Sequence, residues 1–99
     1  MIILTAALQA KKGKETEVEQ ILVHMVSETA QEKGALEYRL HKSKNNDGSF
    51  LFYEKYSGQT AFENHVASAH YKQLGEQLGG LLAKEPIIDF YDFITGITE

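Results

Sequence analysis

The chain has 99 residues, of which 42% are hydrophobic and 24% charged, and its formal net charge is -4. This size and composition predict a single globular domain over residues 1–99, without room for a second hydrophobic core. The acidic balance, with no cluster of basic residues, argues against nucleic-acid binding. No apolar stretch is long enough to predict a membrane span, and the chain has no cysteine for disulfides or thiolate chemistry.

The first third of the chain predicts one strand and one helix. Residues 2–10 alternate with a period of two, and both faces of this strand are largely apolar, which is typical of a strand covered on both sides. Residues 14–33 repeat apolar side chains at the helical period, and Gly34 stands where the C-terminal cap is expected. The N-terminal sequence lacks a basic region before its apolar run, so we expect no export signal and a cytoplasmic location.

A β-hairpin is predicted next. Leu36, Tyr38 and Leu40 alternate with polar residues and indicate a half-buried strand, while residues 45–48 form a strong turn signal. Residues 50–56 are rich in aromatic side chains and contain neither glycine nor proline, so they predict the second strand of the hairpin.

The stretch from residue 50 to residue 71 concentrates more candidate chemical groups than any other, with carboxylates, three tyrosines and two histidines. Glu54 shares a strand face with Phe52 and Tyr56 because alternate residues point the same way. The sequence leaves open whether this face meets the helices or a partner subunit. A capping-box spacing at residues 60–63 predicts that a helix begins nearby.

His65 and His70 are five residues apart, about 140° around one continuous helix, so an unbroken helix would hold them on different faces. Ser68 can cap a second helix between them. We therefore expect His65 at the end of one helix and His70 in the first turn of the next, facing a common cavity. At a helix N-terminus the dipole favours a neutral imidazole, which can accept a proton. The alternative is that both are partly exposed surface histidines without a role.

The last third predicts a glycine-interrupted helix and a final strand. Residues 71–82 follow an amphipathic helical pattern that Gly75, Gly79 and Gly80 interrupt. Each glycine costs a helix interior about 1 kcal/mol relative to alanine, so this helix depends on packing. The glycines indicate either close packing or a mobile lid, two interpretations that the sequence does not separate. Residues 87–97 predict the last strand.

The resulting order of elements is strand, helix, strand, strand, broken helix, strand. This βαββαβ order predicts an α+β fold of the ferredoxin-like type with an antiparallel sheet. Because the helices can cover only one face, apolar residues on both faces of the first and last strands would leave an exposed patch. A second copy of the chain is the expected cover, so we predict a homodimer through the open sheet face.

With this element order, the stretch 50–71 resembles the antibiotic biosynthesis monooxygenase family of dimeric α+β barrels. The shared pattern is an aromatic strand with a glutamate, a polar turn, and two histidines five residues apart. The likeness in element order and length covers nearly the whole chain. The residues that carry the pattern are Phe52, Tyr53, Glu54, Lys55, Tyr56, Ala61, Phe62, His65, Ser68, Ala69, His70 and Tyr71.

The resemblance implies a pocket between the helices and the sheet, capped by the second and third helices. Family members include quinol monooxygenases that use dioxygen without metal or flavin, haem-degrading enzymes, and an isomerase of a phosphorylated signalling sugar. The haem-degrading members rely on a tryptophan and on an asparagine in the first strand. This chain has no tryptophan, and its first strand offers Thr5 and Gln9 instead, so we set that branch aside.

The quinol branch implies a cofactor-independent monooxygenase that oxidises a small aromatic, quinol-type substrate with dioxygen and needs no metal. The protein then supplies a base, a dry pocket and orientation. The candidate catalytic residues are His65, His70 and Glu54. Glu54 is expected to orient a histidine or bind a substrate hydroxyl, unless it forms a surface ion pair with Lys55 or Arg39. The candidate substrate-binding residues are Phe52, Tyr56, Phe62, Tyr71 and Tyr91.

Two alternative functions use the same fold. The first is an isomerase of a small phosphorylated metabolite, which would need a cationic anchor for the phosphate. The lysines available for that anchor are Lys42, Lys44, Lys55 and Lys72. The second alternative is a stress-response dimer that binds a small molecule without turning it over.

Overall fold

The computed structural model describes residues 1–97, which form a four-stranded antiparallel sheet and three helices. The strand order is β2-β3-β1-β4, so β1 pairs with both β3 and β4. The predicted ferredoxin-like α+β fold is confirmed. The elements are β1 (Ile2–Gln9), α1 (Glu15–Thr29), β2 (Ala35–Lys42), β3 (Ser49–Tyr56), α2 (Gln59–Val66), α3 (Ala69–Leu78) and β4 (Ile87–Tyr91).

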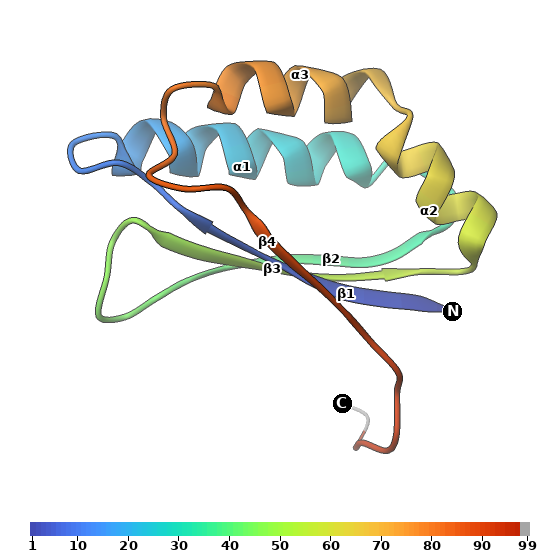
Figure 1. The fold of residues 1–99 in the computed structure, drawn as a ribbon. Coiled ribbons are helices and arrows are strands. Elements are labelled where there is room, and N and C mark those ends of the chain that lie inside the picture. The colour runs from blue at the N-terminus through green and yellow to red at the C-terminus, as the bar shows by residue number, and fades with distance from the viewer. Residues whose placement is uncertain (98–99) are drawn as a thin grey trace.

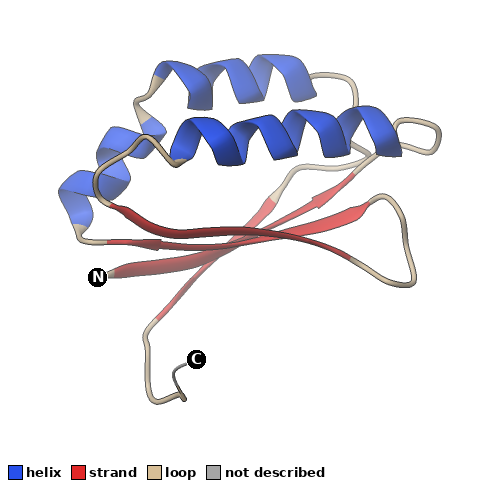
Figure 2. Cartoon of the chain, turned by 180° about the vertical axis from the view of Figure 1, so that it is seen from behind, coloured by secondary structure: helices blue, strands red, loops and turns tan. Residues whose placement is uncertain are grey.

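The helices form a single layer over one face of the sheet (Figure 1). Helices α1 and α3 pack side by side, while α2 continues from the end of β3 and leads into α3. The view from behind shows the opposite face of the sheet without a covering layer (Figure 2). The sheet is open rather than closed into a barrel. None of the helices in residues 1–97 has the length and hydropathy of a membrane-spanning segment.

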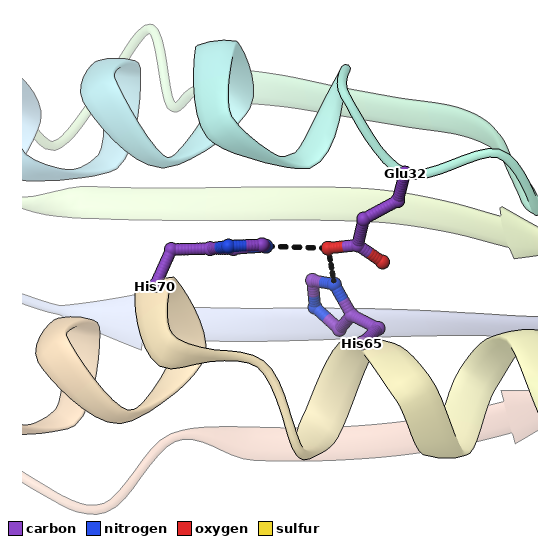
Figure 3. Close-up of side chains that lie close together, drawn as sticks. All are labelled: Glu32, His65 and His70. Carbon is purple, nitrogen blue, oxygen red and sulfur yellow. Dashed lines mark hydrogen bonds and ion pairs between the residues drawn. The ribbon is translucent and has the colours of Figure 1, made fainter.

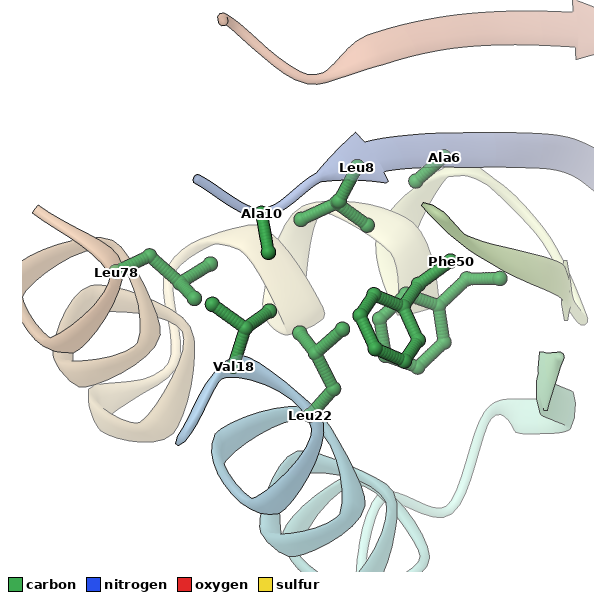
Figure 4. Packing of buried hydrophobic residues seen from close by; sticks show 8 residues of the cluster. Ala6, Leu8, Ala10, Val18, Leu22, Phe50 and Leu78 are labelled. Atoms are coloured by element: carbon green, nitrogen blue, oxygen red, sulfur yellow. The ribbon is translucent and has the colours of Figure 1, made fainter. Parts of the chain in front are cut away.

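The hydrophobic core lies between this helical layer and the sheet. Alternate residues of β1, including Ala6 and Leu8, point toward α1, where Val18 and Leu22 are fully buried (Figure 4). The period of two in the strand and the period of 3.6 in the helix thus bring two apolar surfaces together. Burial of these side chains is the main favourable contribution to folding.

Strand β3 sends its alternate residues into the same core. Phe50, Phe52, Glu54 and Tyr56 are buried, and Glu54 pairs in register with Leu4 of β1. The face of β3 that carries Glu54 therefore meets the helices and not an external partner. The sequence left this point open.

The first helix ends earlier than its apolar pattern predicts, at Thr29 rather than at residue 33. Gly34 is consequently not its cap, because Ala30 holds that position. Gly34 lies instead where the connection to β2 passes very close to α2: a Cβ built on it would overlap with the Cβ of Ala61. A side chain at this position would force the two segments apart.

The predicted break between the two histidines is confirmed. Helix α2 ends at Val66, and Ser68 caps α3 by accepting a hydrogen bond from the backbone N–H of Tyr71. The predicted capping box is wrong, because α2 begins at Gln59 and no side chain caps its start. The Gln59 side chain instead donates to Glu63, one helical turn further on.

The last strand is shorter than predicted and ends at Tyr91 rather than at residue 97. Residues 92–97 carry on past the sheet, away from the helical layer, without pairing as a strand within the chain (Figure 1). Their apolar side chains are among the most exposed of the described residues: Phe93 is 69% and Ile94 is 89% exposed. The apolar side chains of this segment therefore find no partner strand among the described residues.

Candidate functional site

An apolar cavity of about 180 Å³ lies between the sheet and the helices α2 and α3. Phe52 and Tyr38 form part of its floor, together with the inward-facing residues of β1. Phe62, Tyr71 and Leu74 from the helices close it from above. The aromatic sequence of β3 and the broken helix therefore meet in one cavity, because β3 leads directly into α2.

Glu54 is the acidic side chain in the described wall of this cavity, and only 5% of it is exposed. The hydroxyl of Tyr56 donates a hydrogen bond to Oε1 of Glu54 over 2.7 Å. Burial raises the pKa of Glu54 to about 7, against the opposing effect of this hydrogen bond. Near neutral pH the carboxyl group is thus able to give up or take up a proton.

His65 is buried in the same wall, with 2% of its surface exposed. Its ring packs among Tyr38, Tyr56 and Tyr71, with centroid distances of 5.4, 5.1 and 5.3 Å. Burial lowers the pKa of His65, against the raising effect of a hydrogen bond with Glu32. Desolvation therefore favours a neutral imidazole at this position.

The hydrogen bond with Glu32 assigns the tautomer of His65. Nδ1 lies 2.8 Å from Oε2 of Glu32. A carboxylate only accepts, so Nδ1 carries the proton and donates it to this bond. In a neutral ring, the other nitrogen, Nε2, then keeps its lone pair. His65 is therefore able to accept a proton at Nε2.

His70 contacts the same oxygen of Glu32 from the first turn of α3 (Figure 3). Its Nε2 lies 2.5 Å from Oε2, and the centroids of the two imidazole rings are 6.1 Å apart. His70 does not line the apolar cavity. The expectation that both histidines face a common cavity is thus wrong: they converge on Glu32, and only His65 reaches the cavity.

Sequence reasoning missed Glu32, which falls within the predicted helix of residues 14–33 and received no role there. The side chain follows the end of α1, on the connection to β2. An acidic residue is electrostatically unfavourable at a helix C-terminus, and this was the available signal that Glu32 has another partner. The signal is weak, because the sequence does not show which basic or polar groups lie near this connection.

Glu54 does not contact either histidine through a hydrogen bond in the described structure. Glu32 contacts both imidazole rings instead. The alternative ion pair is wrong as well. Arg39 and Lys55 both lie near Glu37, on the opposite face of the sheet. Among the expectations for Glu54, contact with a substrate hydroxyl is the one consistent with its position in the cavity wall.

The predicted aromatic residues divide into three groups. Phe52, Phe62 and Tyr71 line the cavity. Tyr56 lies behind the wall, where its hydroxyl contacts Glu54. Tyr91 does not line the cavity. It pairs with Ile3 of β1, and because Leu4 points to the helices, Ile3 and Tyr91 face the open side of the sheet.

A model of the family described as antibiotic biosynthesis monooxygenase matches residues 1–77. The chain belongs to this family. A Deinococcus radiodurans protein that is provisionally named an antibiotic biosynthesis monooxygenase is similar in structure, with a TM-score of 0.87 and 27% identity over 100% of this chain and 98% of its own. Together with the family match, such neighbours support a monooxygenase-type role.

Two further solved structures confirm the fold. The protein PA3566 of Pseudomonas aeruginosa has a TM-score of 0.89 at 24% identity, covering 95% of this chain and 94% of its own. Rv0793 of Mycobacterium tuberculosis has a TM-score of 0.89 at 22% identity, covering 98% of both chains.

A curated relative in Synechocystis, the uncharacterized protein sll1783, is 24% identical over 90 residues. The match covers 91% of this chain and 61% of that relative. The chain thus spans about three fifths of the length of the curated relative it matches.

Proposed function

We propose that this protein is a cofactor-independent monooxygenase that oxidises a small aromatic, quinol-type molecule with dioxygen. The observation that carries the proposal is the apolar cavity with two groups for proton transfer in its wall, His65 and Glu54. Its volume of about 180 Å³ is comparable to the ~150 Å³ of an apolar protein cavity that binds benzene. Such a cavity suits a small aromatic ring system.

The first proposed step is deprotonation of the bound substrate. Nε2 of His65 accepts the proton of a phenolic hydroxyl, and Glu32 stabilises the resulting imidazolium through Nδ1. The apolar walls exclude water, so the phenolate is not stabilised by hydration and is more readily oxidised. The aromatic side chains of the cavity hold the ring in one orientation.

The later steps use dioxygen as the oxidant and the substrate as the reductant. The phenolate transfers one electron to dioxygen, and the two radicals combine to form a bond between a ring carbon and oxygen. The His65 imidazolium returns its proton to the resulting peroxide anion, which gives a hydroperoxide. The hydroperoxide then loses water: the O–O bond breaks as the leaving oxygen is protonated, the proton of the carbon passes to the Glu54 carboxylate, and a carbonyl group forms. One oxygen atom stays in the product and the other leaves as water, with all four electrons supplied by the substrate. Glu54, with a pKa of about 7, is placed to donate the proton to the leaving oxygen.

Oxygen consumption with a panel of quinols and dihydroxynaphthalenes tests this proposal. We expect uptake by the wild type, and a value of kcat/KM about a hundredfold lower for His65→Gln, the low end for losing a positioned base. His24→Gln is the matched control, because His24 is exposed on α1 and pairs with Glu28. Ligands that bind without any oxygen uptake would instead identify a non-catalytic binding protein.

The isomerase alternative finds no support in the cavity. Within the described residues, the lining includes neither lysine nor arginine, so a phosphate group would be buried there without a positive partner. Burial of an unpaired charge is strongly unfavourable.

We also propose that the protein is a homodimer through its open sheet face. Two exposed apolar surfaces support this assembly. One is the open sheet face with Leu51, and the other is the segment of residues 92–97. A second copy of the same chain would cover both surfaces without requiring another partner.

A further inference from the structure

Three potential metal ligands converge just outside the cavity wall. Nδ1 of His65, Nε2 of His70 and Oε2 of Glu32 all lie within 4.8 Å of one another. They come from three separate segments: the connection after α1, the end of α2 and the first turn of α3 (Figure 3). Both nitrogens approach the same carboxylate oxygen rather than one oxygen each, so the three potential ligand atoms lie close together.

We propose that Glu32, His65 and His70 bind a divalent transition-metal ion such as Zn²⁺ or Co²⁺, with water completing the coordination. Two imidazole nitrogens and one carboxylate oxygen suit these borderline ions, whereas Mg²⁺ and Ca²⁺ prefer oxygen ligands alone. Three protein ligands with an open position are a common arrangement for zinc outside structural sites. The sequence predicts no metal site, because nothing in it places Glu32 beside the histidines.

The geometry requires only a small rearrangement. Zinc bonds of about 2.0–2.2 Å in a tetrahedral arrangement separate the ligand atoms by roughly 3.4 Å. The two nitrogens lie 2.8 and 2.5 Å from the oxygen, at hydrogen-bond length. Each therefore moves away by less than about 1 Å to admit an ion. Glu32 and His70 are 16% and 19% exposed, which gives an ion and its water molecules access from solvent.

Occupation of this site changes the chemistry on the cavity side of His65. Without an ion, Nδ1 holds the proton and Nε2 keeps the lone pair. A metal ion takes the lone pair of Nδ1, so the proton of the neutral ring moves through solvent to Nε2. The nitrogen that accepted a proton then donates one. This consequence rests on the proposed function: a bound ion inhibits the oxygenase by removing its base.

Calorimetric titration of the tag-free full chain with Zn²⁺, after treatment with a chelator, tests the site itself. We expect one ion per wild-type chain, and an affinity at least about tenfold lower for Glu32→Gln and His70→Gln. The control His24→Gln alters the exposed His24–Glu28 pair on α1 and should bind as the wild type does. Equal affinities in the wild type, Glu32→Gln and His70→Gln would overturn the proposal, as would loss of binding in His24→Gln.

A second measurement covers the case in which Glu32→Gln does not fold. His70 lies in the partly exposed first turn of α3, so His70→Gln should retain the circular dichroism spectrum of the wild type. Co²⁺ bound by the wild type should show visible absorption bands of a nitrogen- and oxygen-coordinated ion, and His70→Gln should lose them. Identical cobalt spectra for the two proteins would overturn the site.

Oxygen uptake during a Zn²⁺ titration separates the two proposals. If Zn²⁺ inhibits oxygen uptake at the concentrations at which calorimetry shows it to bind, the result supports the change of the His65 tautomer. Full oxygen uptake by the zinc-bound protein would overturn that change. A chelated protein that consumes no oxygen, yet binds one Zn²⁺ through Glu32 and His70, would overturn the proposed function and support the metal site.

Discussion

Two carboxylates with different surroundings organise the site at the scale of single residues. Glu54 lies in the cavity wall, where desolvation opposes its charge. Glu32 lies outside that wall, partly exposed, and accepts hydrogen bonds from His65 and His70. Glu54 therefore contributes a proton that exchanges near neutral pH, while Glu32 fixes the orientation and tautomer of His65.

The raised pKa of Glu54 predicts a pH-dependent cost in stability. Between its ordinary pKa of 4.5 and its folded-state value of about 7, the folded protein binds more protons at Glu54 than the unfolded chain does. The stability that comes from keeping this group neutral is thus fully present below pH 4.5 and is lost as the pH rises through about 7. Relative to Glu54→Gln, the wild type should lose about 2 kcal/mol of unfolding free energy between about pH 5 and about pH 8.

Urea unfolding of both proteins at several pH values measures this difference. The comparison cancels most of the contribution of His65, which is present in both. Glu76→Gln on the exposed side of α3 is the control for removal of a carboxylate outside the cavity. A difference between the wild type and Glu54→Gln that stays constant over this range would show that Glu54 ionises normally in the folded state.

The candidate residues differ in how far the sequence could identify them. His65 and Glu54 could be found as candidates because the capping serine at position 68 predicts the helix break and strand alternation groups Glu54 with Phe52, although alternation did not say which way that face points. Glu32 could not, because its role arises from a contact across 33 residues of chain. The burial of His65 among three tyrosines also predicts that truncating this side chain lowers stability, since it would leave a cavity.

At the scale of elements, helix α3 forms one side of the cavity and contributes Gly75 to its wall. Gly75 lines both the cavity and the open groove formed with residues 78–86. A Cβ built on Gly75 would meet nothing within 4 Å, so close packing does not explain this residue. The mobile-lid interpretation stays a prediction.

Gly75→Ala should stabilise the protein by about 1 kcal/mol, because alanine has the higher helix propensity and the added methyl group meets no neighbour. Thermal unfolding measures this as a rise in Tm of several degrees, roughly 4–8 °C per kcal/mol for a domain of this size. Gly75→Leu should instead weaken substrate binding by filling the cavity mouth.

Gly80→Ala, in the turn that follows α3, is the matched control for Gly75→Ala. A Cβ on Gly80 also meets nothing within 4 Å, but its φ of +80° lies in the left-handed region. Alanine there should destabilise the protein by about 1–2 kcal/mol. If Gly75→Ala lowered Tm as well, the helix would need flexibility at residue 75 that its geometry does not show.

The boundaries of helices and strands could be predicted where neighbouring residues in the chain determine them. They could not be predicted where contacts with distant residues determine them. Ser68 carries its own capping hydroxyl, so the break before α3 is readable from the sequence. The end of α1 is different, because the connection must turn early to bring Gly34 against Ala61 of α2. Likewise, β4 ends at Tyr91, where its pairing with β1 ends and no other strand of residues 1–97 continues alongside it.

At the scale of the whole molecule, the one-sided helical layer leaves the other sheet face uncovered (Figure 2). Leu51 is 40% exposed on this face, and Ile94 in the segment after β4 is 89% exposed. Apolar surface of this kind favours association with a second copy. The wild type should therefore sediment at about twice its monomer mass of 11.1 kDa at micromolar concentration.

Leu51→Glu should shift this equilibrium toward the monomer, because it would bury a charge in the interface. Val23→Glu is the control: Val23 is an exposed apolar residue of α1, on the helical side of the molecule. Sedimentation of the wild type as an 11.1 kDa monomer would contradict the dimer.

We propose that the chain, without metal or flavin, inserts one atom of dioxygen into a quinol-type substrate. Mass spectrometry of the product formed under isotopically labelled dioxygen by chelator-treated protein tests this insertion. We expect a product that carries one labelled oxygen atom, with its yield greatly reduced in His65→Gln. Formation of unlabelled product, or a labelled yield that His65→Gln leaves unchanged, would contradict this proposal.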